Sequence, residues 1–252
     1  MRRLAVALAP LVSLGAASDP LPVTYAQVVR VLPHDPGAYT EGLFIDRGVL
    51  FESTGEVGAS SVRRVDLATG RVIEQVAIPK PYYGEGIAPW RDQILSLTWQ
   101  NQRGFRWRRQ GLAPIGMFRY RGEGWALTRM ADVLVMSDGT ADLRFVDPAS
   151  FKEIRRLRVT ANGAPVTNLN ELEYVDGEIL ANIWLTDRIV RIDPRSGRVL
   201  GMIDVAALHD RAGNTDGNEV ANGIAWDSAR RRLYITGKRW PVMFEIAWPP
   251  RR

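Results

Sequence analysis

Five short motifs along the chain begin with a carboxylate or carboxamide side chain and continue with a small or apolar residue. Their leading residues are Glu41, Glu85, Glu123, Asn170 and Asn222. They follow one another at intervals of about 40 to 50 residues, the period of radially repeated β-sheet folds. If the repeats surround one axis, the five side chains meet at one mouth of a central channel. Neighbouring carboxyl groups and burial both raise pKa, so the motifs predict a site for general acid–base chemistry.

Bulky side chains stand at corresponding places near the ends of the second strands of these repeats. Trp99, Trp184 and Lys238 occupy such places, and Trp125 follows closely on Glu123. The face of a tryptophan ring attracts cations, at about 0.5 to 2 kcal/mol per contact, and amides can stack on it. We therefore expect a pocket with aromatic walls beside the acidic ring.

The elements that position these residues are short strands separated by turns. In the first repeat we expect four strands, at residues 42–46, 49–53, 61–66 and 71–78. Asp66 opens the turn between the last two, and Asp147 and Asp193 open the corresponding turns of later repeats. The second, third and fourth repeats follow the same order. The fifth repeat has only three strands, because the sequence ends before a fourth.

An unpaired strand at residues 24–32 precedes the first repeat and supplies the missing strand. We therefore predict an all-β, five-bladed β-propeller, closed by an N-terminal strand that completes the last blade. Radial closure leaves only short, protected sheet edges. A β-sandwich is the alternative. It accounts for the alternating strands but not for a strand that is missing at one end and present at the other.

The 252 residues contain no cysteine and two histidines, His34 and His209, which we interpret as surface loop residues. A zinc site needs three or four protein ligands, so we expect no metal and no cofactor. Two arginines near the start precede an apolar run that is too short to span a bilayer. We interpret residues 1–18 as a signal peptide and residues 19–252 as one domain. The protein is then periplasmic or secreted, without stable membrane association.

The formal net charge of +5 includes arginine clusters at residues 106–109, 155–158 and 230–232. These clusters fall on expected outer strands and turns of different blades. Without a shared basic stripe, they predict solvated edges and no nucleic-acid partner. We expect a monomer.

Nine stretches stand in order along the chain, namely YTEGL at 39–43, ESTG at 52–55, SSVRRV at 60–65, GEGI at 84–87, LTW at 97–99, SDG at 137–139, NELEY at 170–174, NGIAWD at 222–227 and TGK at 236–238. Together they resemble the plant-type and bacterial glutaminyl-peptide cyclotransferases, a five-bladed propeller family. The resemblance covers the chain from about residue 39 to residue 246. It is carried by the order of the nine stretches, since each alone is weak.

The resemblance implies an acyltransferase that converts an N-terminal glutaminyl residue to pyroglutamate and releases ammonia without a metal. Its partners are then peptides or proteins with N-terminal glutamine, and its catalytic glutamate matches Glu85. The residues that match the family's substrate pocket are Tyr39, Glu41, Tyr83, Trp99, Trp125, Asn170, Trp184 and Lys238. Glu41 stands where a glutamine is usual, and Tyr39 and Tyr83 replace what are commonly phenylalanines.

In this reaction the α-amino group loses a proton and attacks the γ-carboxamide, and ammonia leaves protonated, so one carboxyl group can serve both proton transfers. We expect Glu85 to carry the proton and Asn170 or Lys238 to stabilise the oxyanion. Two alternatives stay open. One is a non-catalytic propeller that binds a peptide or small ligand in its central pocket. The other is a calcium-dependent hydrolase whose acidic ring supplies oxygen ligands.

Overall fold

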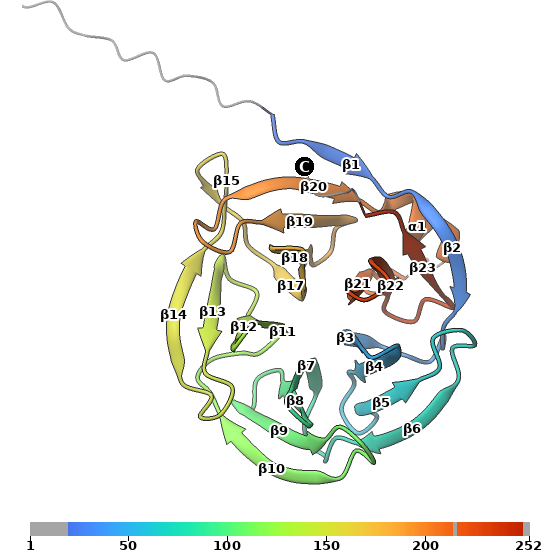
Figure 1. Cartoon of the computed structure of the whole chain (residues 1–252), viewed down its shortest axis with the longest axis vertical. Helices are drawn as coiled ribbons and strands as arrows, with labels where there is room; N and C mark the ends of the chain where they lie inside the picture. Colours follow the sequence, from blue (N-terminus) through green and yellow to red (C-terminus); the bar gives the residue numbers. More distant parts are fainter. Residues whose placement is uncertain (1–19, 214–215, 249–252) are drawn as a thin grey trace, which may run out of the picture.

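The computed structural model describes residues 20–213 and 216–248, which are almost entirely β-structure (Figure 1). Five sheets stand around a central axis, which confirms the predicted five-bladed propeller. The predicted signal peptide at residues 1–18 lies outside the described residues. Within the described ranges, no helix is long and apolar enough to cross a membrane.

Each blade runs outward from an innermost strand. The innermost strands are β3 (Thr40–Asp46), β7 (Gly84–Trp90), β11 (Ala126–Met130), β17 (Leu169–Val175) and β21 (Ala221–Asp227). The second strands are β4 (Val49–Thr54), β8 (Gln93–Thr98), β12 (Val133–Ser137), β18 (Glu178–Ile183) and β22 (Arg232–Gly237). The third strands are β5 (Ser61–Val65), β9 (Arg103–Arg108), β13 (Asp142–Val146), β19 (Arg188–Ile192) and β23 (Val242–Ile246). The innermost strands contact one another in a closed cycle, which forms the central ring.

Fourth strands complete the first four blades, and those of the first, third and fourth blades follow turns of the predicted kind. These strands are β6 (Val72–Ala77), β10 (Pro114–Arg119), β14 (Glu153–Arg158) and β20 (Val199–Asp204). In the turn before β6, Asp66 Oδ1 accepts the backbone N–H of Ala68 at 3.1 Å and of Thr69 at 2.9 Å. Asp147 Oδ1 accepts the N–H of Ser150 at 2.7 Å in the corresponding turn of the third blade. The aspartates therefore hold these turns by local hydrogen bonds.

The N-terminal segment closes the ring with two strands in place of the predicted one. β2 (Val28–Pro33) pairs antiparallel with β23 and completes the fifth blade, as predicted. β1 (Val23–Tyr25) runs parallel to β20 and adds a fifth strand to the fourth blade (Figure 1). The prediction of a single strand at residues 24–32 is wrong, because the backbone leaves the edge of β20 for that of β23 at Ala26 and Gln27.

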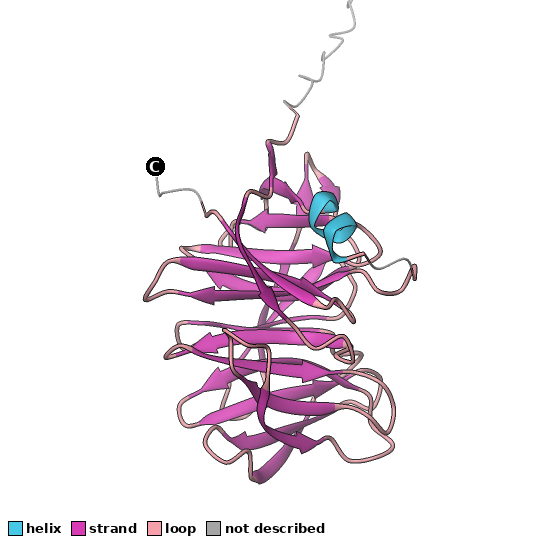
Figure 2. Cartoon of the chain, turned by 90° about the vertical axis from the view of Figure 1, so that its right-hand side faces the viewer, coloured by secondary structure: helices cyan, strands magenta, loops and turns pink. Residues whose placement is uncertain are grey.

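Two short elements in the connections between blades were absent from the sequence-based predictions. The hairpin of β15 (Thr160–Ala161) and β16 (Ala164–Pro165) precedes the fourth blade (Figure 1). The helix α1 (Ala206–Ala212) precedes the fifth blade (Figure 2). α1 begins without a side-chain cap and ends at Gly213 in the left-handed conformation, with φ of 76°. A helix this short, without a capping side chain, carries few local sequence signals.

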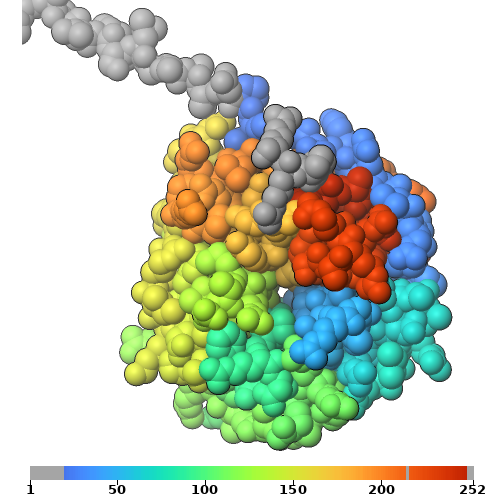
Figure 3. All heavy atoms as spheres, viewed as in Figure 1, coloured from blue at the N-terminus to red at the C-terminus, as the bar shows by residue number. Residues whose placement is uncertain are grey.

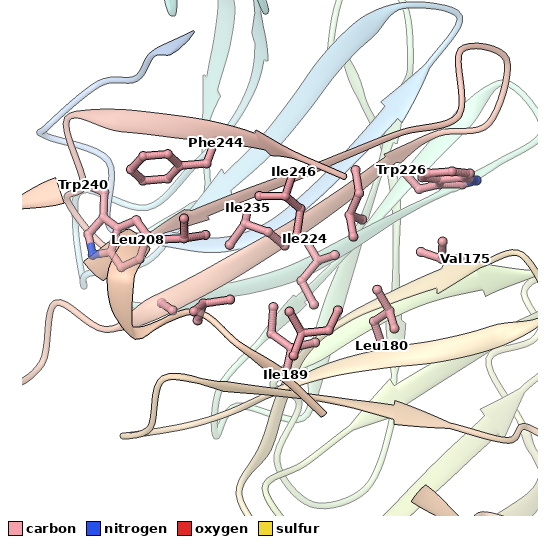
Figure 4. Close-up of a cluster of buried hydrophobic side chains, with 14 of the residues drawn as sticks. Val175, Leu180, Ile189, Leu208, Ile224, Trp226, Ile235, Trp240, Phe244 and Ile246 are labelled. Atoms are coloured by element: carbon pink, nitrogen blue, oxygen red, sulfur yellow. The ribbon is translucent and has the colours of Figure 1, made fainter. Parts of the chain in front are cut away.

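Apolar side chains pack the facing surfaces of adjacent blades, with one buried cluster at each of the five boundaries. Between the fourth and fifth blades, Leu180, Ile189, Ile224 and Ile235 are buried together with Trp240 (Figure 4). Burial of apolar area contributes about 25 cal/mol per Å². The ring is therefore held together mainly by contacts between blades.

His34 is buried, so its interpretation as a surface residue is wrong. Its Nδ1 lies 2.7 Å from the Trp240 carbonyl oxygen and its Nε2 lies 3.0 Å from Glu52 Oε1, while Arg63 approaches the other carboxylate oxygen at 3.6 Å. Burial opposes charge on both partners. Glu52 nevertheless raises the pKa of His34, and His34 with Arg63 holds the pKa of Glu52 below its ordinary value. This ion pair joins the fifth blade to the first, where the ring closes. The other histidine, His209, lies on α1.

Candidate active site

All nine residues that the sequence assigns to a pocket line one cavity. It has a volume of about 180 Å³ and receives side chains from all five blades. The lining residues are Tyr39, Glu41, Tyr83, Glu85, Trp99, Trp125, Asn170, Trp184 and Lys238. In a space-filling view the blades surround a hollow at the centre of the molecule (Figure 3).

Four of the five predicted ring residues share one position at the start of an innermost strand. Glu41, Glu85, Asn170 and Asn222 each lie where the pairing of the first and second strands of the blade shifts register. Adjacent innermost strands approach closely here. A Cβ atom on Gly86 would lie 2.4 Å from the Cα of the third blade's first innermost residue, so a glycine is needed after Glu85.

The third blade departs from the predicted alignment by two residues. The pairing of β11 with β12 places Trp125, and not Glu123, at the ring position. Glu123 lies in the loop before β11 and does not line the cavity. Its Glu-Gly dipeptide resembles those of the first two blades, but register is set by pairing with the second strand. The ring therefore holds two carboxyl groups in place of the predicted three.

Glu123 instead orients two tryptophans of the pocket. Its Oε2 accepts the indole N–H of Trp99 at 2.8 Å and of Trp125 at 2.9 Å, and its Oε1 accepts an N–H of Gln100 at 3.0 Å. Burial works against its charge, but the three donors outweigh burial and hold the pKa of Glu123 below its ordinary value. The prediction missed this role. The sequence signal that could have indicated it is the position of Trp125, two residues after Glu123.

Glu41 is buried, and its carboxylate accepts hydrogen bonds from three side chains that come from different parts of the ring. Lys238 Nζ donates to Oε1 at 2.8 Å, the Tyr83 hydroxyl donates to the same oxygen at 2.9 Å, and Asn222 Nδ2 donates to Oε2 at 3.1 Å. Burial raises the pKa of Glu41, and these donors oppose the rise. Burial disfavours the charge of Lys238, but Glu41 and Glu85 outweigh it and raise the pKa of Lys238. We assign Glu41 and Lys238 as a buried ion pair.

Glu85 occupies the same position in the second blade and has different surroundings. It is 6% exposed, and only its backbone carbonyl accepts a hydrogen bond among the described residues, from Ser53 Oγ at 2.7 Å. Burial, followed by the negative charge of Glu41, raises the pKa of Glu85 well above the ordinary carboxyl value, and Lys238 offsets part of this rise. A buried carboxyl with free oxygens and a raised pKa can accept a proton and return it.

Glycines make room for the aromatic walls. A Cβ atom on Gly55 would lie 2.5 Å from the Tyr83 hydroxyl oxygen, and one on Gly139 would lie 2.6 Å from the Trp125 ring. These glycines lie in the two blades whose second strand is not followed by a bulky residue. Trp125 then meets Trp184 edge to face, with ring centroids 5.5 Å apart. The walls are packed aromatic faces, on which a cation or an uncharged side chain can stack.

Asn170 and Tyr39 complete the lining. Asn170 lines the cavity, and its Oδ1 atom is buried without a hydrogen-bond partner among the described residues. The Tyr39 hydroxyl donates to the Asn218 carbonyl oxygen at 3.4 Å, and its ring centre lies 4.6 Å from Lys238 Nζ. The cavity thus places two N–H donors, Asn170 and Lys238, beside the unpartnered carboxyl of Glu85.

Comparison with known proteins gives three similarities. The sequence profile of the glutamine cyclotransferase family matches residues 3–248. A curated Arabidopsis thaliana protein named glutaminyl-peptide cyclotransferase is 40% identical over 225 residues, which cover 87% of this chain and 70% of that protein. The crystal structure of Myxococcus xanthus glutaminyl cyclase superimposes with a TM-score of 0.85 and 34% identity, covering 91% of this chain and 98% of that one.

A fourth similarity concerns the fold alone. The WD40 β-propeller domain of Doa1 superimposes with a TM-score of 0.50 at 8% identity, over 82% of this chain and 63% of that one. The family profile, by contrast, spans nearly the whole chain, and the Arabidopsis protein is matched over most of its length. The chain therefore belongs to the glutamine cyclotransferase family and is an enzyme of the acyltransferase type.

Proposed function

We propose that this enzyme converts N-terminal glutaminyl residues of peptides or proteins to pyroglutamate and releases ammonia, with Glu85 as the general acid–base. The observation that carries the proposal is the Glu85 carboxyl, which lines an aromatic cavity, is buried and has no hydrogen-bond donor among the described residues. Family membership and the activity named for the Arabidopsis relative support the reaction. The cavity offers a proton carrier, donors for a developing negative charge and walls for a flexible side chain.

The proton transfers follow from the position of Glu85. The α-amine of the substrate has a reference pKa of about 7.7 to 8.0, so a useful fraction is neutral near pH 8. As the neutral nitrogen attacks the γ-carbonyl carbon, the new ring C–N bond forms and the nitrogen gives one proton to ionised Glu85. Glu85 passes that proton to the γ-nitrogen, the old C–N bond breaks and ammonia leaves. The carboxyl group ends the cycle in its starting state.

Negative charge develops on the γ-oxygen during the attack. Asn170 Nδ2 and an N–H of Lys238 are assigned as its donors, since Glu41 engages only one of the three ammonium N–H groups. The tryptophan walls hold the glutamine side chain folded toward its own amine. Ring closure within one molecule benefits from such positioning, because effective molarities of about 10⁵ M or more are precedented.

The proposed reaction uses no metal. Among the residues that the structure describes, no three His, Cys, Asp or Glu side chains are grouped to hold a metal ion. The Glu41 carboxylate already has three donors, so it is not free to coordinate the calcium ion of a hydrolase. We extend the proposal to a monomer that residues 1–18 direct to the periplasm or the outside, on the basis of their arginines, apolar run and small residues.

Ammonia release from a glutaminyl dipeptide tests the function. The wild type should form the pyroglutamyl product equally with and without a chelator. Glu85→Gln keeps the shape of the side chain but cannot carry the proton, so turnover should fall about 10²- to 10⁴-fold with an unchanged Tm. Glu74→Gln, the same change at an outer strand where Glu74 pairs with Arg64, is the matched control.

Each other outcome has a distinct meaning. A fall of less than tenfold in Glu85→Gln would move the proton transfer to another group. A wild type that binds the dipeptide but releases no ammonia would be a binding propeller. Loss of activity on chelation would contradict the metal-independent reaction.

A further inference from the structure

We infer that Glu41 makes the cavity select an uncharged γ-carboxamide over a γ-carboxylate, which makes it a specificity-determining residue. The inference rests on the proposed function, because it concerns the side chain that the same pocket accepts. The two ligands to be separated are peptides that begin with glutamine and peptides that begin with glutamate. Their γ-groups have nearly the same shape and differ in charge.

The cation of the cavity already has an anionic partner within the protein. Lys238 is the single cationic side chain among the described residues that line the cavity. Its Nζ lies 2.8 Å from Glu41 Oε1, with side-chain exposures of 7% and 2%. Tyr83 and Asn222 hold the same carboxylate through hydrogen bonds of 2.9 and 3.1 Å. The ammonium charge is therefore compensated before any substrate arrives.

A γ-carboxylate entering this cavity leaves water, and that transfer costs several kcal/mol unless a cation compensates it. The one lining cation is paired with Glu41, and Glu85 adds a second acidic group. A γ-carboxamide carries no charge and avoids this cost, while its oxygen still receives N–H groups from Asn170 and Lys238. Selectivity therefore comes from the charge of Glu41 and not from the shape of the pocket.

Two substitutions separate the charge from the hydrogen bonds. Glu41→Gln removes the negative charge and leaves a side chain of the same size that Tyr83 can still contact. The ammonium of Lys238 is then free to compensate a ligand carboxylate. Tyr83→Phe removes one donor to Glu41 and leaves both charges of the ion pair. If charge sets selectivity, only the first substitution changes it strongly.

The test compares two dipeptides that share a second residue, at about pH 8, where the α-amine is partly neutral. The glutamyl dipeptide is measured as a competitive inhibitor (Ki) and the glutaminyl dipeptide as a substrate (KM). In Glu41→Gln, the ratio of KM to Ki should rise about tenfold or more, the effect of one neighbouring opposite charge. In Tyr83→Phe this ratio should change less than about threefold. In Glu74→Gln it should stay at the wild-type value.

Two results would overturn the inference. One is a ratio in Glu41→Gln that matches the wild type. The other is an equally large change in Tyr83→Phe, since the donors and not the charge would then set selectivity.

Failure of the proposed function can be distinguished from failure of this inference. A wild type that releases no ammonia from the glutaminyl dipeptide refutes the function, and calorimetry then compares both dipeptides as ligands of the wild type and Glu41→Gln. A preference for the glutaminyl dipeptide that weakens in Glu41→Gln would still support the inference, and an unchanged preference would refute it.

Discussion

Glu41 and Glu85 stand at the same position in neighbouring blades, but their carboxylates have opposite surroundings. Glu41 accepts hydrogen bonds from Lys238, Tyr83 and Asn222, whereas no described residue donates to the carboxylate of Glu85. When two carboxyl groups share a site, the proton goes to the one whose charge is less well stabilised, which here is Glu85. Glu41 therefore fixes Lys238, and Glu85 is left to move a proton.

The first prediction concerns pH. Glu85 acts as a base in its ionised form, and the charge of Glu41 raises its pKa. Glu41→Gln removes that repulsion and frees the charge of Lys238, and both changes lower the pKa of Glu85. The acidic limb of kcat/KM against pH should therefore move to lower pH by about one unit. Profiles that superimpose for the two proteins would mean that the carboxyl groups are not coupled.

The second prediction concerns the shared acceptor of two tryptophans. Glu123→Ala removes the oxygen to which Trp99 and Trp125 donate, so the aromatic walls lose their fixed orientation. KM for a glutaminyl dipeptide should rise about tenfold, with a smaller change in kcat, because a hydrogen bond to a charged group contributes about 1.5 to 3 kcal/mol. Gln100→Ala removes only the bond to the other oxygen and is the control. An unchanged KM in Glu123→Ala would contradict the positioning role.

The third prediction concerns ring closure, and it distinguishes the two N-terminal strands. A truncated chain that begins at residue 27 lacks β1 but keeps β2, so the fifth blade stays complete. A chain that begins at residue 34 also lacks β2, exposes the edge of β23 and loses the buried Leu32. Its Tm should fall much further than that of the first chain, by about 2 to 4 °C for each kcal/mol lost. Equal Tm values for the two chains would show that β2 does not close the ring.

The fourth prediction concerns the buried pair of His34 and Glu52. His34 has a pKa raised above 6.5, so its contribution is full below that value and is lost as pH rises through the folded pKa. Glu52 has a pKa lowered below 4.5, so its contribution is full above that value and is lost as pH falls through the folded pKa. The pair therefore stabilises the ring most between about pH 4.5 and 6.5.

The substitution His34→Gln tests this pair. It should destabilise the protein by about 3 to 5 kcal/mol near pH 5.5, because Glu52 is left buried with only part of its compensation. The loss should become smaller as pH rises through the folded pKa of His34, where the wild type loses this proton. Thermal unfolding of both proteins across this pH range measures the difference. A loss that does not vary with pH would mean that the pKa of His34 is the same in the folded and the unfolded protein, and a loss that grows as pH rises would mean that His34 is neutral in the folded protein.

Local patterns in the sequence were sufficient to predict the repeat, most of the strands and seven of the nine residues of the cavity. Alternating apolar residues and turn-forming aspartates such as Asp66 act within a few residues, so their effect is visible without the fold. Closure of a ring of repeats brings equivalent residues together, which is why Glu41, Glu85 and Asn170 were expected at one mouth. The resemblance to a known family pointed to these seven and added Tyr39 and Tyr83.

The tertiary structure decided what depends on contacts between distant segments. The register of the third blade is set by the pairing of its innermost strand with its second strand. This pairing puts Trp125 in the ring, and Glu123 accepts hydrogen bonds from the indoles of Trp99 and Trp125. The donors to Glu41 come from other blades, since Tyr83 precedes the second blade and Lys238 belongs to the fifth. These partners meet only when the ring has closed. The difference in pKa between two glutamates that share a Glu-Gly dipeptide is therefore a property of the folded ring.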